Sequence, residues 1–306
     1  MQFFNVINNN SISLLKNLIK LKQIKWVLLL SFLAPLSTFA QDWHIGGFAG
    51  ISNYSGDLAQ QRVDMKYTRP ALGLMVKRDI NRYLTLRAGL NWGHIAGADS
   101  TNESKLLIAR NLSFRSVIWD GHFIAEFNFL DIYEKGFTPY VFGGIALFQF
   151  YPTTKDSLGN TVPLRRLSTE GQNLAEYPDR RQYALHQFAI PFGAGIKVML
   201  NDTWTLGLEI GFRKTFTDYL DDVSKTYVDE ATRLRYWRGQ EAVDFAYRGD
   251  EVNTKGITPG TYPADGTIRG SDKNKDWYIF SGLTLTYRIG GGGMFGKQKF
   301  SSCPKY

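Results

Sequence analysis

Residues 204–213 read WTLGLEIGFR, and apolar residues alternate there with polar or small ones. Successive side chains of a β-strand point to opposite faces, so this stretch predicts a strand with one apolar face and one face of glycine and charge. The apolar face carries Trp204, Leu206, Leu208, Ile210 and Phe212. Such a strand fits the wall of a barrel or one sheet of a sandwich.

The same alternation recurs in seven further segments, and the segments are about 10 to 13 residues long. Ordinary strands have about five or six residues, whereas a strand that crosses a bilayer at a tilt needs about 9–11. Aromatic residues near segment ends, namely Trp204, Trp277, Tyr287 and Tyr140, fit the two aromatic girdles of a membrane barrel. The eight segments run near Trp43–Tyr54, Arg69–Arg78, Leu84–Trp92, Val117–Phe129, Pro139–Phe150, Phe188–Leu200, Trp204–Arg213 and Trp277–Ile289.

Short and long connections alternate between these segments. The short ones are residues 79–82, 131–137 and 201–203, and the long polar ones are residues 55–68, 96–111, 151–183 and 221–275. Short periplasmic turns and long outer loops are typical of outer-membrane barrels. A water-soluble sandwich needs neither such long strands nor four long loops at one end. The sequence therefore predicts an all-β fold, an eight-stranded antiparallel up-and-down outer-membrane β-barrel with long extracellular loops and short periplasmic turns.

The N-terminal 40 residues have the pattern of a secretory signal. They contain four lysines and no acidic residue, then an apolar run at 26–33 and small residues before Gln41. An anchor helix is the alternative, but the run is too short to span a bilayer. We therefore predict a cleaved signal peptide over residues 1–40, the barrel over 41–289 and a periplasmic tail over 290–306.

Composition excludes several classes of protein. One cysteine in 306 residues excludes an internal disulfide framework and any multi-cysteine metal site. The mean hydropathy of −0.24 excludes a polytopic helical membrane protein. Loss of the signal lowers the formal net charge from +8 to +4, too mild an excess to predict nucleic-acid binding.

The polar face of the predicted strands carries the lumen residues. An eight-stranded barrel is only wide enough inside for side chains, and buried charge is costly unless it is paired. We therefore predict a salt-bridged plug with a structural role, and no open diffusion pore. Its members are Lys77, Arg87, Asp120, His122, Glu126, Lys197, Glu209, Arg213 and Arg288.

Catalytic signals are weak. His122 and Asp120 share a face, and Ser113 lies on the same strand, which could imitate a nucleophile with its base. A hydrogen-bonded structural histidine is the favoured interpretation, because the sequence contains no nucleophile-elbow motif. We predict no catalytic residue and no cofactor, and keep an enzyme acting on lipid only as a third hypothesis.

Two acidic stretches invite a cation interpretation. One contains Asp218, Asp221 and Asp222, and the other is Asp272-Lys273-Asn274-Lys275-Asp276, with oxygen ligands at alternate positions. A calcium loop needs glycine at its sixth position, where this chain has Trp277. Solvated loop carboxylates are therefore the favoured interpretation, and no metal is predicted.

The longest loop and the tail are the candidate contact segments. Loops of such length are usually functional, so we expect the aromatic-rich loop at 221–275 to fold over the barrel mouth. The lone cysteine of an exported chain suggests an intermolecular disulfide, although a free, frayed tail remains the alternative. The tail residues predicted to bind a periplasmic partner are Phe295, Phe300, Cys303, Pro304 and Tyr306.

Several short motifs, in this order, resemble a known family. They are Asn53-Tyr54-Ser55-Gly56-Asp57-Leu58, Arg110-Asn111-Leu112-Ser113-Phe114, residues 215–224 (TFTDYLDDVS) and the final Cys303-Pro304. Together with the strand pattern, the mature chain resembles the PorG-like, DUF6089-like outer-membrane proteins of Bacteroidetes.

The resemblance implies a component of the type IX secretion system. Members of that family are thought to tie the outer membrane to a periplasmic ring of PorK and PorN subunits, so PorK/PorN-like proteins and outer-membrane lipids are the expected partners. The resemblance supplies no catalytic residues. The alternative function is a small OmpW/OmpX-like barrel that acts as a carrier or pore for small molecules.

Overall fold

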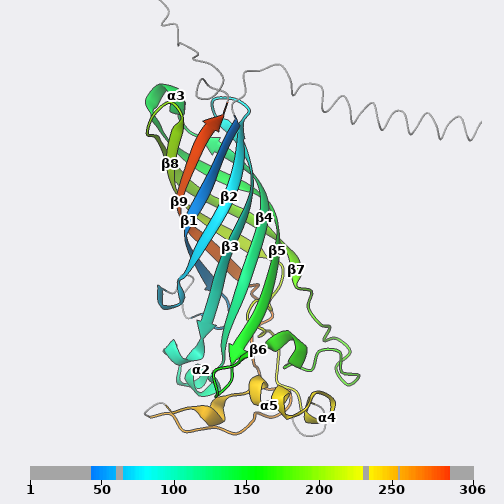
Figure 1. Cartoon of the computed structure of the whole chain (residues 1–306). Coiled ribbons are helices and arrows are strands. Elements are labelled where there is room, and N and C mark those ends of the chain that lie inside the picture. Colours follow the sequence, from blue (N-terminus) through cyan, green and yellow to red (C-terminus); the bar gives the residue numbers. More distant parts are fainter. Residues whose placement is uncertain (1–42, 60–64, 230–233, 254–255, 290–306) are drawn as a thin grey trace, which may run out of the picture. The chain divides into compact units, whose positions relative to one another are not determined.

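Eight long antiparallel strands form a closed barrel in the computed structural model, which describes residues 43–59, 65–229, 234–253 and 256–289 (Figure 1). The order around the barrel is β4-β3-β2-β1-β9-β8-β7-β5, and pairing of β4 with β5 closes it. The predicted fold is thereby confirmed. The barrel strands are β1 (Trp43–Ser55), β2 (Arg69–Asp79), β3 (Leu84–Ala98), β4 (Ser113–Asn128), β5 (Phe137–Lys155), β7 (His186–Met199), β8 (Trp204–Thr215) and β9 (Trp277–Ile289).

Three strands are clearly longer than the sequence predicts, namely β3 with 15 residues, β4 with 16 and β5 with 19, whereas β9 has the predicted bounds. The extra length lies at the ends that join the long loops. There β5 continues into a hairpin with the short strand β6 (Thr161–Pro163). Pairing between Arg115 of β4 and Thr153 of β5 keeps these extensions in the sheet. Alternation therefore predicted where the strands lie but underestimated how far they continue.

The two faces of the wall differ as the alternation predicts. On β2, for example, Leu72, Leu74 and Val76 point outward and are exposed, as lipid-facing side chains of a membrane barrel are. Tyr140 departs from the prediction, because it points inward with 1% of its surface exposed and is not a girdle residue. The pair Gly143-Gly144 later in the same strand interrupts the alternation, which left the inward face of β5 ambiguous in the sequence.

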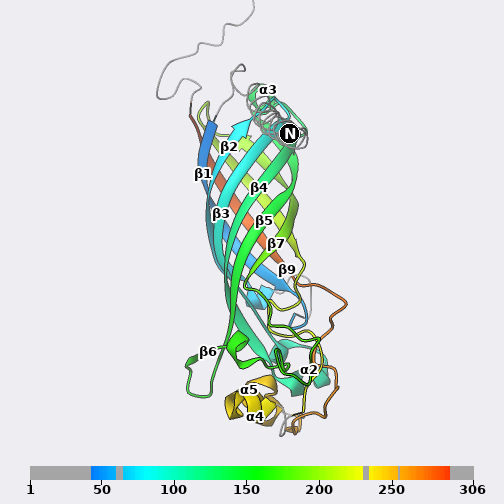
Figure 2. The same cartoon turned by 90° about the vertical axis from the view of Figure 1, so that its right-hand side faces the viewer.

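The two ends of the barrel carry different structures (Figures 1 and 2). One end has the short turns, the helix α3 (Ile132–Lys135), and the two described chain ends at Trp43 and Ile289, which pair with each other. The long loops at the other end form a cap. Its helical elements are η2 (Met65–Tyr67), η3 (Asp99–Thr101), α2 (Lys105–Arg110), η4 (Leu164–Leu167), α4 (Arg235–Arg238), α5 (Gln240–Ala246) and η6 (Gly249–Glu251).

The cap has its own apolar packing, continuous with that of the barrel. Val228, Leu234 and Phe245 of the longest loop belong to the same buried cluster as Tyr54 and Phe114 of the strands. The cap is therefore a folded structure and not a set of separate loops. No helix in the described part of the chain is long and apolar enough to cross a membrane.

The seam between β1 and β9 depends on two facing glycines. Gly50 pairs with Gly282. A Cβ at Gly282 would come within 2.5 Å of the Ala49 carbonyl oxygen and of the Gly50 Cα. Such a contact is far below van der Waals distance, so the two strands approach this closely only because side chains are absent.

A Gly282→Val substitution should weaken the seam, because the new side chain would push β9 away from β1. We expect the free energy of unfolding to fall by about 1–3 kcal/mol, the usual cost of overpacking. Urea unfolding of the refolded barrel, followed by tryptophan fluorescence, measures this. Ser281→Val, at the neighbouring position on the opposite face, is the matched control. Equal stability of the two variants would contradict the role of the glycine pair.

Candidate functional site

Glu126 is the centre of charge in the lumen. Its carboxylate has no exposed surface and lies between three cations from three other strands. Oε1 lies 3.1 Å from the Lys77 Nζ and 3.2 Å from the Arg87 Nη1, and Oε2 lies 2.5 Å from the Lys197 Nζ. Lys197 also donates to the Asn128 side-chain oxygen at 2.9 Å. This charge-assisted cluster joins β2, β3, β4 and β7 across the inside of the barrel.

Glu209 extends the cluster toward β8. It accepts from the Arg87 Nη1 at 2.7 Å and from the Tyr140 hydroxyl at 2.6 Å. The Arg87 guanidinium stacks over Phe142 at 4.9 Å from the ring centre, and the Lys197 ammonium lies 4.2 Å from the centre of the Tyr140 ring. Aromatic faces therefore add to the stabilisation of cations that are cut off from water.

A second charged layer lies nearer the cap. Asp120 contacts the His122 Nδ1 at 2.8 Å and accepts from the Tyr278 hydroxyl at 2.7 Å. The Arg213 Nε is 3.5 Å from the same carboxylate, and the guanidinium lies over Phe280. All five side chains are buried. The layer therefore adds a second set of paired charges inside the barrel.

This arrangement is a filled lumen. Arg87, Asp120, Glu126 and Arg213 each expose 1% of their surface or less, whereas the lining of a water-filled pore would be exposed. Ser113 bonds to the Thr154 hydroxyl at the cap end of β4, nine residues along the strand from His122. At about 3.3 Å per residue, that separation is far beyond hydrogen-bond reach. The residues that could imitate a catalytic triad are therefore not brought together.

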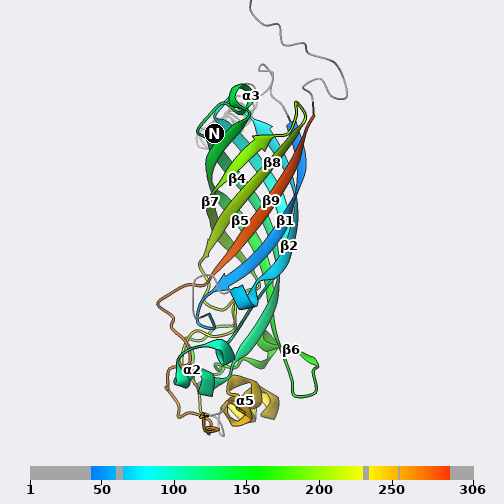
Figure 3. The ribbon, with the colours of Figure 1, turned by 90° about the vertical axis from the view of Figure 1, so that its left-hand side faces the viewer.

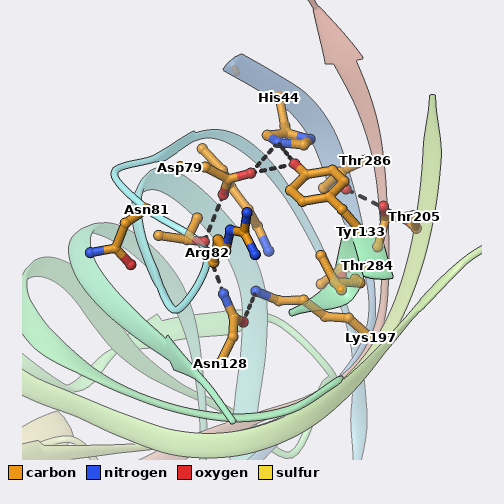
Figure 4. Close-up of a pocket in the computed structure, with 13 residues that line it drawn as sticks. His44, Asp79, Asn81, Arg82, Asn128, Tyr133, Lys197, Thr205, Thr284 and Thr286 are labelled. Atoms are coloured by element: carbon orange, nitrogen blue, oxygen red, sulfur yellow. Dashed lines mark hydrogen bonds and ion pairs between the residues drawn. The ribbon is translucent and has the colours of Figure 1, made fainter. Parts of the chain in front are cut away.

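A latch of three side chains closes the lumen at the α3 end (Figure 4). Asp79 lies 3.0 Å from the His44 Nε2 and accepts from the Tyr133 hydroxyl at 2.5 Å. Tyr133 belongs to α3, which Asp131 caps by accepting from the Tyr133 backbone N–H. The cavity beside these side chains measures about 30 Å³, room for only one or two water molecules. The turn between β4 and β5 thus places an aromatic side chain on the α3 side of the charge cluster (Figure 4).

Arg288 was predicted to join the lumen network. It faces inward like the other eight predicted lumen residues, and it lies at this mouth, where its guanidinium stacks over the Tyr133 ring at 4.6 Å.

Buried carboxylates hold the cap to the barrel. The Tyr54 hydroxyl donates to Asp221 at 2.6 Å and lies 3.2 Å from Asp276. Asp276 also accepts from the Leu220 N–H, and Asp221 from the Val223 N–H. The interpretation of these residues as solvated loop carboxylates is wrong, because each exposes 1% of its surface. They bind backbone N–H groups where the chain turns over the barrel mouth.

A second part of the cap depends on Glu170. It pairs with Arg269 at 3.0 Å and accepts from the backbone N–H groups of Ser224 and Lys225. Asp222 accepts from the hydroxyls of Thr169 and Tyr183. Nearby, Asp218 accepts from the Ser224 hydroxyl, and it is also buried. In the described ranges, no group of three or more acidic, histidine or cysteine side chains has the geometry of a metal site.

Some functional side chains were missed in the sequence. Tyr140 and Tyr278 complete the hydrogen bonding of lumen carboxylates, and their positions on the inward face were the available signal. His44, Asp79 and Tyr133 come from three separate segments, so no local pattern connects them. The tail residues Phe295, Phe300, Cys303, Pro304 and Tyr306, and the signal at 1–40, lie outside the described residues.

Comparison with known proteins identifies a family and several barrels of low sequence identity. The family described as "Domain of unknown function (DUF6089)" matches residues 22–160 and 163–249. No curated protein matches the chain. Among solved structures, Neisserial surface protein A has 7% identity and a TM-score of 0.40, with 81% of this chain and 97% of that chain covered.

Two further barrels are similar at the same level. OprG, an outer membrane protein from Pseudomonas aeruginosa, has 10% identity and a TM-score of 0.36, with 81% and 95% of the two chains covered. A major outer membrane protein from Thermus thermophilus has 12% identity and a TM-score of 0.36, with 82% and 100% covered.

Replacing Glu126 by Gln should destabilise the barrel strongly. The amide cannot neutralise Lys77, Arg87 and Lys197, and breaking a buried ion pair costs about 3–5 kcal/mol. Urea unfolding in detergent should show that loss. Glu134→Gln, which removes an exposed carboxylate from α3, should leave the midpoint unchanged. A Glu126→Gln variant as stable as the wild type would show that the lumen cations are neutralised in another way.

The cap should open more readily as pH rises. Burial raises the pKa of Asp218 to about 7 and of Asp222 to about 6, from an ordinary value near 3.8. The folded cap thus retains protons that the opened cap releases, and its stability falls between about pH 4 and pH 7. Amide hydrogen exchange in residues 218–229, corrected for intrinsic rates, should show opening increased about tenfold or more from pH 5 to pH 8.

Asparagine variants provide the control for this pH dependence. Asp222→Asn suits the site, since residue 222 has φ of +68°, a conformation that asparagine tolerates. The double variant Asp218→Asn, Asp222→Asn should lose part of the pH dependence, and the remainder belongs to Asp221 and Asp276, whose pKa values burial also raises. The exposed Asp272→Asn change should keep all of the pH dependence. An unchanged pH slope in the double variant would assign the effect to other groups.

Proposed function

The chain belongs to the DUF6089 family, and we propose that it is a non-enzymatic outer-membrane barrel that anchors periplasmic ring subunits of the type IX protein secretion system. The resemblance of the sequence motifs to PorG-like proteins supplies the partners, PorK/PorN-like ring proteins. The outward apolar face supports residence in a membrane, and the barrel fold supports the outer membrane as its place.

The filled lumen is the observation that carries this proposal. Glu126 and its three cations lie in the space through which a solute would pass, and Asp120 and Arg213 lie in the same space nearer the cap. A barrel that conducts nothing acts through its surfaces. An anchor needs only a rigid body in the membrane and a contact surface on one side of it.

The end that carries α3 is the proposed periplasmic contact surface. The three short turns lie there, and the chain leaves β9 at the same end. Residues 290–306 follow Ile289 in the sequence, and the partner-binding residues of this proposal are Phe295, Phe300, Cys303, Pro304 and Tyr306. In this proposal Cys303 forms an intermolecular disulfide with a ring subunit.

An enzymatic role has little support. His122 is buried and its Nδ1 contacts Asp120, while its Nε2 has no hydrogen-bond partner in the described part of the chain, so no nucleophile is bonded to this ring. A small-molecule carrier of the OmpW/OmpX kind fits the barrel fold equally well, but the closed lumen opposes an open pore. Single-channel conductance of the purified protein in planar bilayers would favour the carrier over the anchor.

Co-purification tests the anchor. A tag inserted at the exposed hairpin tip 157–159 leaves the tail free. Pull-down from mild detergent without reductant should recover periplasmic ring subunits. Cys303→Ser should abolish any disulfide-linked species on non-reducing gels, and Phe295→Ala with Phe300→Ala should reduce recovery about tenfold or more.

Exposed aromatics on the cap provide the matched control. Tyr236→Ala with Trp237→Ala removes two rings that are more than half exposed at the opposite end. Recovery of ring subunits should be unaffected. If that variant loses them while the tail variants do not, the contact lies on the cap. If the wild-type barrel is recovered alone, the anchoring role is wrong.

A further inference from the structure

The outward face of β3, β4 and β5 changes from apolar to basic near the cap. Trp92 and Trp119 are cross-strand partners, with ring centres 6.5 Å apart. Tryptophan side chains prefer the boundary between acyl chains and headgroups. The next outward residue on β3 is His94, and Arg115 lies two outward positions beyond Trp119 on β4. Basic side chains therefore begin where lipid headgroups would lie.

A groove runs beside these residues. It has a volume of about 500 Å³, and β4, β5 and the β5–β6 hairpin form its walls. Figure 3 shows this hairpin projecting from the barrel beside the cap. Val117 and Tyr151 line the part nearer the lipid-facing band, and Thr153 and Thr161 add hydroxyl groups nearer the cap. The groove is thus apolar toward the membrane and polar away from it.

The charge of the groove is uniform. Arg115 and Lys155 are exposed cations in its lining, and none of its described lining residues is acidic. No ion pair between described residues involves either side chain. The Lys155 Nζ donates at 2.8 Å to the Gly159 carbonyl and to the Thr161 hydroxyl, which are neutral acceptors. The positive charge is therefore positioned but not neutralised by the chain.

We propose that this groove binds the phosphate headgroup of an anionic lipid in the outer leaflet. The phosphate accepts from Arg115 and Lys155, and the acyl chains continue along Val117 and the lipid-facing band. Charge-assisted hydrogen bonds to phosphate are stronger than bonds between neutral groups. The groove combines them with apolar contact to the acyl chains on the side nearer the lipid-facing band. The site is independent of the periplasmic anchor, since it lies at the opposite end of the barrel.

Native mass spectrometry of the purified full chain with dioleoyl phosphatidic acid tests the proposal. Dioleoyl phosphatidylcholine carries the same acyl chains with a zwitterionic headgroup. We expect the barrel to retain phosphatidic acid about tenfold more tightly than phosphatidylcholine. Arg115→Gln with Lys155→Gln should remove that preference, and Arg115→Lys should retain most of it.

The controls distinguish binding at this groove from nonspecific attraction between anionic lipids and other cations of the protein. Lys135→Gln removes an exposed cation at the α3 end, and the preference should persist. The Gln variants are compared only after urea unfolding shows normal stability, and the single Arg115→Gln variant tests the site if the pair does not fold. Equal retention of both lipids, or a preference unchanged by Arg115→Gln, would overturn the proposal. Binding of inorganic phosphate as tightly as phosphatidic acid would also overturn it, because the acyl chains would then contribute nothing and the site would be one for free anions.

Discussion

The buried carboxylate of Glu126 is the constraint on which the barrel interior depends. A side chain with no exposed surface keeps its charge only if cations neutralise it, and these cations come from β2, β3 and β7. A slip of one residue in any strand would turn its cation toward lipid. The ion pairs inside the barrel and the apolar face outside it therefore require the same register of strand pairing. Together they favour one arrangement of the strands over arrangements shifted by one residue.

A lumen filled in this way limits where function can reside. The buried, paired side chains oppose an open path through the interior, and three surfaces are left: the lipid-facing wall, the α3 end and the cap. The α3 end is closed by Asp79, His44 and Tyr133, which hold the β4–β5 turn against the mouth. That latch makes the end a fixed surface, as an anchor for other proteins requires. The cap is fixed too, but by buried carboxylates.

The sequence predicted the barrel wall well because the same period-two alternation occurs in eight segments. The assignment of each segment as a strand is supported by the other seven. It predicted the inward position of Glu126, Arg87 and Asp120 for the same reason. It misjudged Tyr140, since glycines blur the alternation in β5. It also misjudged Asp221 and Asp276, because loops have no period to show that a carboxylate will meet Tyr54. The latch combines three separate segments, and only the closed barrel brings them together.

The lumen carboxylates and one group of cap carboxylates offset the cost of buried charge in different ways. In the lumen, acidic side chains face lysine and arginine, so their charges are neutralised within the barrel. In the cap, Asp218, Asp221 and Asp276 accept hydrogen bonds from hydroxyl and backbone N–H groups, and none of them forms an ion pair with a described cation. Hydrogen bonds alone offset less of the cost of burying a charge. Carboxylates held in this second way have raised pKa values, as Asp218 does, so a proton bound to such a group stabilises the folded cap.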